Sequence, residues 1–243
     1  VLHRPLFSAG DVVAEQEQRW SHRKGPGIPW TPLGATYGPT GATYRHLAYV
    51  VDSAARTARL TITAPSGAHP ATAAEARLEG TDWWILRALR ELEDALFDLR
   101  FNRPEVGLVL LEAKGDADVV RRTDALLAAA EDDWFVSEVR GFVRRTLKRV
   151  DLTAKTFFAF AVPGSCFVGT FLELALAADR LYVKDDSAAP TLLGTTASNA
   201  GAFPMPNGLS RLETRFLGDP PAVGRVLAHA GPIDAPTALA LGL

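Results

Sequence analysis

The sequence is poor in cysteine, and this excludes several kinds of site. Cys166 is the only cysteine among the 243 residues, so no disulfide can form within the chain and no zinc site built from several thiolates is possible. An unpaired cysteine is more often inert packing than a nucleophile, and we expect packing for Cys166. No metal site is expected either, because none of the five histidines forms a pair at helical ligand spacing.

Other common signatures are also missing. The chain contains no GxxxxGK[ST] or GxGxxG segment, which argues against a nucleotide phosphate loop, and no GxSxG nucleophile elbow. No apolar run approaches the roughly 20 residues of a membrane span. The formal net charge is -2, and no long basic run suggests nucleic-acid binding. We therefore expect a cytoplasmic protein that binds neither nucleic acid nor membranes.

The first part of the chain is expected to differ from the rest. Residues 25–41 contain five Gly and four Pro, which is too many for a helix or a strand. We therefore predict an N-terminal arm or linker over residues 1–42, and its Trp20 and Trp30 suggest that it docks on another surface. Residues 43–243 are expected to form one domain. The chain starts without Met and ends in what resembles a helix-to-loop passage, so we expect truncation, above all at the C-terminus.

The hydrophobic pattern of residues 43–243 predicts an α/β fold, because strands alternate with helices. The expected strands are short and rich in apolar or β-branched residues, and they cover 43–51, 57–63, 106–111, 156–162 and 181–183. The expected helices carry apolar residues at helical spacing, and they cover 82–100, 118–130, 134–150 and 169–178. Asp82 is the expected N-cap of the first of these helices.

The most informative segment is TFFAFAVPGSCFVGTFLELALAADRLYV, residues 156–183. It runs through a strand, a Pro-Gly turn, a loop of small residues, a helix and a further strand. Gly164 and Gly169 allow the backbone to approach a ligand closely. The unpaired N–H groups at the start of the helix, together with the helix dipole, favour developing negative charge such as that of a thioester enolate.

This segment resembles the pattern of the crotonase superfamily, the enoyl-CoA hydratases and isomerases. The matching residues are Gly169, Glu173, Leu174, Ala175, Ala178 and Asp179. A second block at 201–212 is similar to the superfamily's Gly-x-x-Pro-x-x-x-Gly-x-x-Arg-Leu segment. Longer phrases resemble the benzoyl-CoA-dihydrodiol lyases within the superfamily, namely VPGSC, GTFLELALAADR, PMPNGLSRL and WFVSEVRGFVRRTLKR.

The resemblance covers roughly residues 43–243 and implies a fold of stacked ββα turns with a helical C-terminal region. It implies an acyl-CoA whose thioester carbonyl lies in an oxyanion hole of two backbone amides. One amide corresponds to Thr170, next to Gly169, although the superfamily typically has glycine at the position of Thr170. The other amide lies near Val119. Lys114 and Arg121 are candidates for contact with the CoA phosphates, and a solvated surface role is an equal alternative for both.

Glu173 falls on one of the two catalytic glutamates of the hydratases, which implies a general acid or base. The second glutamate falls at Ala197, which cannot transfer protons, so simple hydration is disfavoured. Ser198 and Asn199 flank this position and are candidates to hold a water or a ring oxygen. Arg211 is expected to pair structurally rather than to bind phosphate.

The resemblance implies cleavage of the ring of 2,3-epoxybenzoyl-CoA, or of the derived dihydrodiol, in aerobic benzoate degradation. The products would be 3,4-didehydroadipyl-CoA semialdehyde and formate. The CoA thioester is then the substrate, no cofactor is needed, and a homo-oligomer is implied. Two alternatives stay open, a generic enoyl-CoA hydratase or isomerase and a non-catalytic acyl-CoA-binding subunit.

Overall fold

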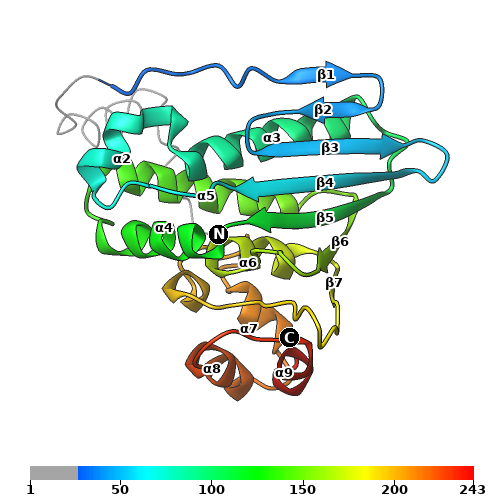
Figure 1. The fold of residues 1–243 in the computed structure, drawn as a ribbon, viewed down its shortest axis with the longest axis vertical. Coiled ribbons are helices and arrows are strands. Elements are labelled where there is room, and N and C mark those ends of the chain that lie inside the picture. Colours follow the sequence, from blue (N-terminus) through cyan, green and yellow to red (C-terminus); the bar gives the residue numbers. More distant parts are fainter. Residues whose placement is uncertain (1–26) are drawn as a thin grey trace, which may run out of the picture.

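The computed structural model describes residues 27–243, and the start of the predicted arm, with Trp20, lies outside this range. The described residues form one seven-stranded sheet in which the strands follow chain order (Figure 1). Its strands are β1 (Thr36–Gly38), β2 (Gly41–Thr43), β3 (Leu47–Asp52), β4 (Thr57–Ala64), β5 (Leu108–Gly115), β6 (Thr156–Ala161) and β7 (Arg180–Val183). Strands β1 to β4 pair antiparallel, and β4 to β7 pair parallel.

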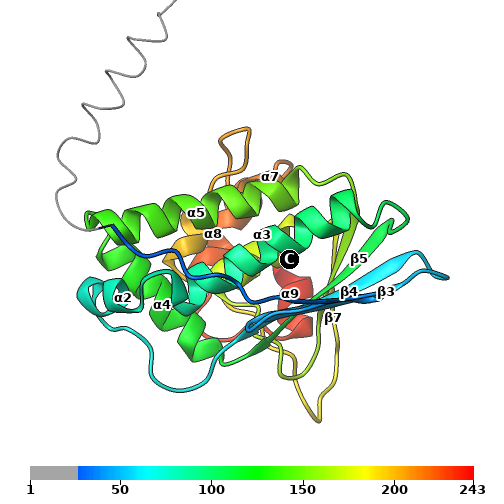
Figure 2. The ribbon, with the colours of Figure 1, turned by 90° about the horizontal axis from the view of Figure 1, so that it is seen from above.

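The helices lie between and after the parallel strands. They are α2 (Ala73–Glu79), α3 (Trp84–Phe101), α4 (Ala117–Ala129), α5 (Trp134–Asp151), α6 (Gly169–Ala177), α7 (Arg211–Arg215), α8 (Pro221–Ala228) and α9 (Ala235–Leu241), with short 3-10 helices η1 (Gly80–Asp82) and η2 (Ala197–Ala200). Figures 1 and 2 show α3 and α5 side by side along one face of the sheet. Helices α7 to α9 form a separate group around a small apolar cluster.

The core lies between the sheet and these helices. Alternate residues of β4, from Ala58 to Ala64, are buried, which is the two-residue period of a strand with one face inward. Helix α3 contributes its apolar stripe, including the fully buried Ile85 and Leu89. The α/β class predicted from the sequence is confirmed, and the predicted strands and helices agree with the observed ones within a few residues.

Two local predictions were wrong. Asp82 does not cap α3, because it lies in η1 and instead pairs with Arg87, while the N-cap residue Trp83 makes no side-chain cap. The sheet also begins earlier than expected, since residues 36–43 form β1 and β2 rather than the end of an arm. This edge hairpin was hidden because its Gly and Pro residues are typical of loops.

Residues 27–35 run without regular structure along α3 and are held there by polar contacts. The Thr31 N–H donates to Thr81 Oγ1 at 2.9 Å, and Arg90 Nη2 donates to the Thr31 carbonyl at 2.8 Å. The Arg90 guanidinium also lies 3.9 Å from the centre of the Trp30 ring. Trp30 stays 68% exposed, so the docking expected of it is limited to this contact with Arg90. In residues 27–243, no helix has both the length and the apolar character that crossing a bilayer requires.

Candidate functional site

Helix α6 is buried over most of its length, from Gly169 to Ala175. Its first N–H groups already have partners within the protein. The Gly169 N–H donates to the Gly194 carbonyl at 2.9 Å, and the Thr170 N–H donates to Asp124 Oδ2 at 2.8 Å. The amide that the sequence assigns to an oxyanion hole is therefore occupied by a carboxylate in this structure.

Asp124 enters this region from α4 and is held by hydroxyl groups as well. Thr170 Oγ1 donates to Asp124 Oδ1 at 2.5 Å, and Thr196 Oγ1 donates to Asp124 Oδ2 at 2.7 Å. Burial raises the pKa of Asp124, while the bonds from Thr170 and Thr196 act in the opposite direction. Gly169 is required beside it, because its φ is +49° and an added Cβ would lie 1.8 Å from Asp124 Oδ2.

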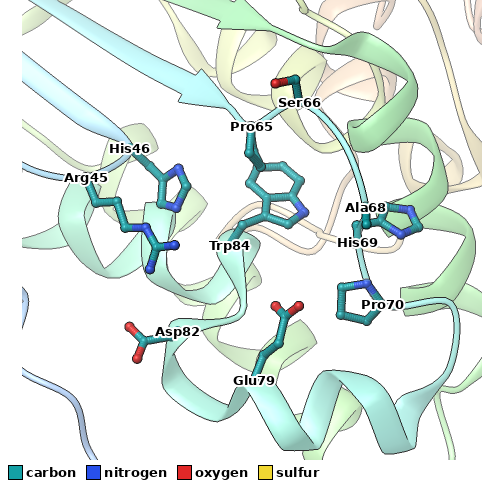
Figure 3. Close-up of a pocket in the computed structure, with 10 residues that line it drawn as sticks. All are labelled: Arg45, His46, Pro65, Ser66, Ala68, His69, Pro70, Glu79, Asp82 and Trp84. Atoms are coloured by element: carbon teal, nitrogen blue, oxygen red, sulfur yellow. The ribbon is translucent and has the colours of Figure 1, made fainter.

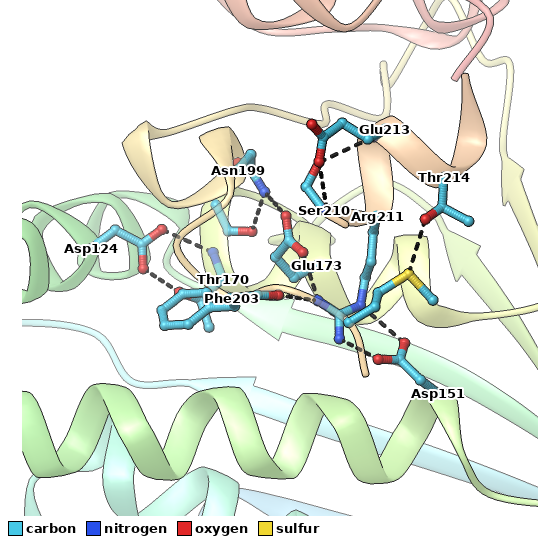
Figure 4. Close-up of polar contacts among 12 residues, drawn as sticks. Asp124, Asp151, Thr170, Glu173, Asn199, Phe203, Ser210, Arg211, Glu213 and Thr214 are labelled. Carbon is cyan, nitrogen blue, oxygen red and sulfur yellow. Dashed lines mark hydrogen bonds and ion pairs between the residues drawn. The ribbon is translucent and has the colours of Figure 1, made fainter. Parts of the chain in front are cut away.

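Glu173 lies one turn further along α6 and has a partner at each carboxylate oxygen (Figure 4). Asn199 Nδ2 donates to Oε1 at 2.7 Å, and Arg211 Nη1 donates to Oε2 at 2.9 Å. Burial raises the pKa of Glu173, and the nearby Arg211 guanidinium is the largest influence in the opposite direction.

Arg211 joins a second buried carboxylate to this arrangement. Its Nε and Nη2 donate to the two oxygens of Asp151, at 3.1 and 2.7 Å, and its Nη1 also donates to the Phe203 carbonyl at 2.9 Å. The guanidinium thus bridges Glu173 and Asp151, and its expected structural pairing is observed. We call the residues with these contacts the α6 cluster: Asp124, Asp151, Thr170, Glu173, Thr196, Asn199 and Arg211.

The other predicted site residues lie in different surroundings. Ser198 is buried beside Asp124, to which its hydroxyl is hydrogen-bonded. The Val119 N–H is not free, because it is capped by Asp116 Oδ1 at 3.3 Å. Lys114 pairs with Glu112 at 2.7 Å and Arg121 with Asp118 at 3.0 Å, both as partly exposed ion pairs.

Sequence reasoning did not single out Asp124 or Asp151. Asp124 had a signal, because it follows Val120 by four residues and precedes Leu127 by three, which places a carboxylate on the buried face of α4. Asp151 had none, since it directly follows the last apolar residue of α5, where polar residues are common. No group of three or more His, Cys, Asp or Glu side chains between residues 27 and 243 is arranged to hold a metal ion.

A cavity of about 400 Å³ opens beyond the carboxyl end of β4 (Figure 3). We call it the β4 pocket, and it is lined by Arg45, His46, Pro65, Ser66, Ala68, His69, Pro70, Glu79, Asp82 and Trp84. Ligands of open α/β sheets bind at this end of the strands, so the position is that of a binding site. Its size is within the range of small-molecule sites.

Trp84 separates the β4 pocket from the α6 cluster. Its indole N–H donates to Thr123 Oγ1 at 2.9 Å, and its ring meets that of Phe171 edge-to-face at 5.7 Å. Thr123 and Phe171 are the chain neighbours of Asp124 and Thr170. Trp84 therefore connects the wall of the β4 pocket to residues that adjoin Asp124 and Thr170.

Comparison with solved structures identifies this architecture. An enoyl-CoA hydratase of Geobacillus kaustophilus HTA426 superposes on 83% of this chain and 67% of its own, with a TM-score of 0.53 and 18% identity. An enoyl-CoA hydratase/carnitine racemase of Magnetospirillum magneticum matches with the same TM-score, 0.53, over 82% and 66% of the two chains, at 18% identity. The chain has the crotonase fold. At such low identity the likeness concerns the fold alone.

Comparison of sequences gives a more specific result. The chain is 44% identical over 218 residues to the benzoyl-CoA-dihydrodiol lyase of Aromatoleum evansii. The match covers 89% of this chain but only 39% of that enzyme. No model of a known protein family matches the chain. The predicted resemblance to these lyases is confirmed.

Proposed function

We propose that this chain is part of a benzoyl-CoA-dihydrodiol lyase, and that it binds the CoA thioester of an oxygenated, dearomatised ring and assists its cleavage. The observation that carries the proposal is the 44% identity over 218 residues with the Aromatoleum evansii lyase. The chain spans 39% of the length of that enzyme.

The proposed substrate is 2,3-epoxybenzoyl-CoA or the dihydrodiol derived from it. Addition of two water molecules to the epoxide, or of one to the dihydrodiol, with scission of a ring C–C bond, would give 3,4-didehydroadipyl-CoA semialdehyde and formate. The thioester is the substrate and no redox cofactor is required. The β4 pocket supports this proposal, since it combines an aromatic wall at Trp84 with the cation Arg45 and the polar groups of Ser66 and Glu79.

Glu173 is the proposed proton carrier. Its surroundings determine its pKa and which of its two hydrogen-bond partners can be replaced. Burial raises the pKa of its carboxyl, which favours a group that takes up and releases a proton. Arg211 is held by Asp151, and Asn199 is held by the Gly169 carbonyl and the Thr196 N–H. The bond from the neutral Asn199 amide is weaker than the charge-assisted bond from Arg211, so it is the one to be exchanged for water or a substrate oxygen.

The decisive experiment is to supply 2,3-epoxybenzoyl-CoA and to measure release of formate and of the semialdehyde. We expect Glu173→Gln to lower the turnover about 100-fold or more, the scale of general acid–base catalysis. Asp151→Asn is the matched control, because it removes the other carboxylate bound to Arg211 and leaves Glu173 in place. Near-normal turnover of Glu173→Gln, or an equal loss in Asp151→Asn, would contradict the proton-carrier role.

One observation favours a second candidate function, in which the chain binds the thioester but does not catalyse cleavage of the ring. The Thr170 N–H, which an oxyanion hole would use, is taken by Asp124. Binding of benzoyl-CoA by the folded chain, without formate release from the epoxide, would support this second candidate. A generic hydratase is disfavoured, because Ala197 stands at the position of the second hydratase glutamate and cannot transfer protons. Robust hydration of crotonyl-CoA would favour the hydratase instead.

We infer a homo-oligomer that acts in the cytoplasm and has no nucleic-acid or membrane partner. The net charge of -2 supports the absence of a nucleic-acid partner. Light scattering during size-exclusion chromatography measures the oligomeric state, and a monomer at all concentrations would contradict the inference.

A further inference from the structure

One buried side chain holds both the segment that runs along α3 and a wall of the β4 pocket. We call this segment, residues 27–35, the strap. Arg87 lies near the start of α3 and is only 7% exposed. Its Nη2 donates to the Leu33 carbonyl of the strap at 2.6 Å, and its Nη1 donates to Asp82 Oδ1. Asp82 lines the β4 pocket two residues before Trp84 (Figure 3), so the guanidinium joins the strap to the pocket.

The third bond of Arg87 leads to a second wall of the pocket through Glu91. Arg87 Nε donates to Glu91 Oε1 at 3.0 Å, and the His46 backbone N–H donates to Glu91 Oε2 at 2.7 Å. His46 lines the β4 pocket, and Glu91 is 0% exposed. A buried carboxylate requires a compensating charge, which Arg87 supplies. Loss of Arg87 would therefore disturb the strap and two walls of the pocket at once.

Arg90 provides a comparison within the same helix. It lies one turn after Arg87, is 5% exposed, and also holds the strap. It donates to the carbonyls of Thr31 at 2.8 Å and Thr81 at 3.3 Å, and neither of these residues lines the β4 pocket. The two arginines are alike in burial and in their contact with the strap, and they differ because the bonds of Arg87 also reach the pocket walls.

We propose that Arg87 is a positioning residue for the thioester, and that docking of the strap on Arg87 and binding of the thioester in the β4 pocket stabilise each other. This inference rests on the proposed function and adds a structural requirement for binding. Coupling between two sites is reciprocal, so a ligand that binds better when the strap is docked must also hold the strap in place. The Thr31 N–H reports on this docking, because it donates to Thr81 Oγ1 at 2.9 Å and exchanges its hydrogen when the strap opens.

The test measures hydrogen exchange of the Thr31 amide by NMR in the full chain, with and without saturating benzoyl-CoA. We expect the thioester to slow this exchange about 5-fold or more, which is the lower end of typical coupling between sites. The Thr237 N–H serves as reference, because it donates to Asp234 Oδ1 at 2.9 Å at the start of α9. Its exchange should not change. Equal slowing of both amides would show a general stabilisation and would overturn the coupling.

Two substitutions separate the strap from the pocket. Arg87→Met should lower the affinity for benzoyl-CoA about 10-fold, measured by isothermal titration, and should abolish the slowing at Thr31. Arg90→Met should speed the exchange of Thr31 in the free protein, because the strap loses a contact. It should keep the slowing by benzoyl-CoA and an affinity within about 3-fold of the wild type, because the bonds that it loses do not involve the pocket walls.

Further variants separate positioning from stability. Arg87→Lys should recover part of the affinity, because its ammonium keeps the charge beside Glu91 but cannot make all three bonds. If Arg87→Met does not fold by circular dichroism, the double variant Arg87→Met/Glu91→Gln replaces it, since it removes the buried charge and still offers an oxygen to the His46 N–H. Its affinity should stay about 10-fold low, because Asp82 and the strap remain without their shared partner. Affinity that recovers together with stability would mean that Arg87 acts only through the fold.

The outcomes distinguish this inference from the proposed function. Binding of benzoyl-CoA without slower exchange at Thr31, or with unchanged affinity in Arg87→Met, overturns the role of Arg87 and leaves the proposed thioester binding supported. Failure of the folded wild-type chain to bind benzoyl-CoA overturns thioester binding in the proposed function, and this inference with it.

Discussion

The α6 cluster and the β4 pocket differ in how their polar groups are satisfied. In the α6 cluster, Glu173 and Asp124 have hydrogen-bond partners at both carboxylate oxygens. In the β4 pocket, the Nε2 atom of His46 is buried and has none. The carboxylates beside α6 are thus held by the protein itself, whereas the β4 pocket contains a buried ring nitrogen that residues 27–243 leave unpaired.

The largest expected effect comes from breaking the framework at Arg211. Arg211→Met leaves the buried carboxylates of Glu173 and Asp151 without their shared cation. Removing one partner of a buried ion pair typically costs about 3–5 kcal/mol, because an uncompensated charge remains. We expect a loss of that size in the free energy of unfolding, measured with urea.

The matched control is Arg225→Met, which removes an exposed ion pair with Asp219. Exposed pairs contribute about 0–1 kcal/mol, so this variant should unfold nearly as the wild type does. Equal effects of the two substitutions would show that the α6 cluster is not an electrostatic framework.

A smaller effect is expected where the framework meets the backbone of α6. Gly169→Ala would place a Cβ 1.8 Å from Asp124 Oδ2, at a φ of +49° that L side chains rarely adopt. We expect a loss of about 2–3 kcal/mol in the free energy of unfolding, from backbone strain and displacement of the carboxylate. Gly141→Ala serves as control, because Gly141 lies within α5 with no atom within 4 Å of the added Cβ.

The control should stabilise the protein slightly, by up to about 1 kcal/mol, since alanine is the better helix former. If Gly169→Ala unfolded like the control, the close approach of Asp124 to α6 would be wrong.

The fold was largely predictable from the sequence, and the reason is periodicity. Buried residues alternate along β4, and in the second half of α3 they recur at helical spacing, at Leu92, Ala95, Leu96 and Leu99. Both patterns are visible without a structure. The edge strands β1 and β2 were not predictable. Each has only three residues, too few to show a two-residue period, and their Gly and Pro neighbours are typical of loops.

The candidate site was predictable only in part. The superfamily pattern located Glu173, and the structure brings Asn199 against it as a direct partner. The pattern did not indicate that Asp124 would occupy the Thr170 N–H, because that contact joins residues 46 positions apart. His46 was not predictable either, since its significance is a missing partner, and only the tertiary structure shows which atoms lack one.

The lowered pKa of His46, in the β4 pocket, makes the stability of the protein depend on pH. His46 takes up a proton only near pH 4 in the folded protein, against an ordinary pKa of 6.5. Between these values the unfolded chain binds more protons, so the stability that comes from His46 is full above pH 6.5 and is lost as the pH falls towards 4. Lowering the pH from 7 to 5 should cost about 2 kcal/mol through this residue.

His46→Gln isolates this contribution, because glutamine does not titrate. The buried carboxyls Asp124, Asp151 and Glu173 have raised pKa values and therefore act in the opposite direction, but they are common to both proteins. We therefore expect the difference in unfolding free energy between wild type and variant to change by about 2 kcal/mol between pH 7 and pH 5. A difference that stays constant over this range would mean that His46 titrates normally in the folded protein, and that its ring is exposed to water rather than held neutral by burial.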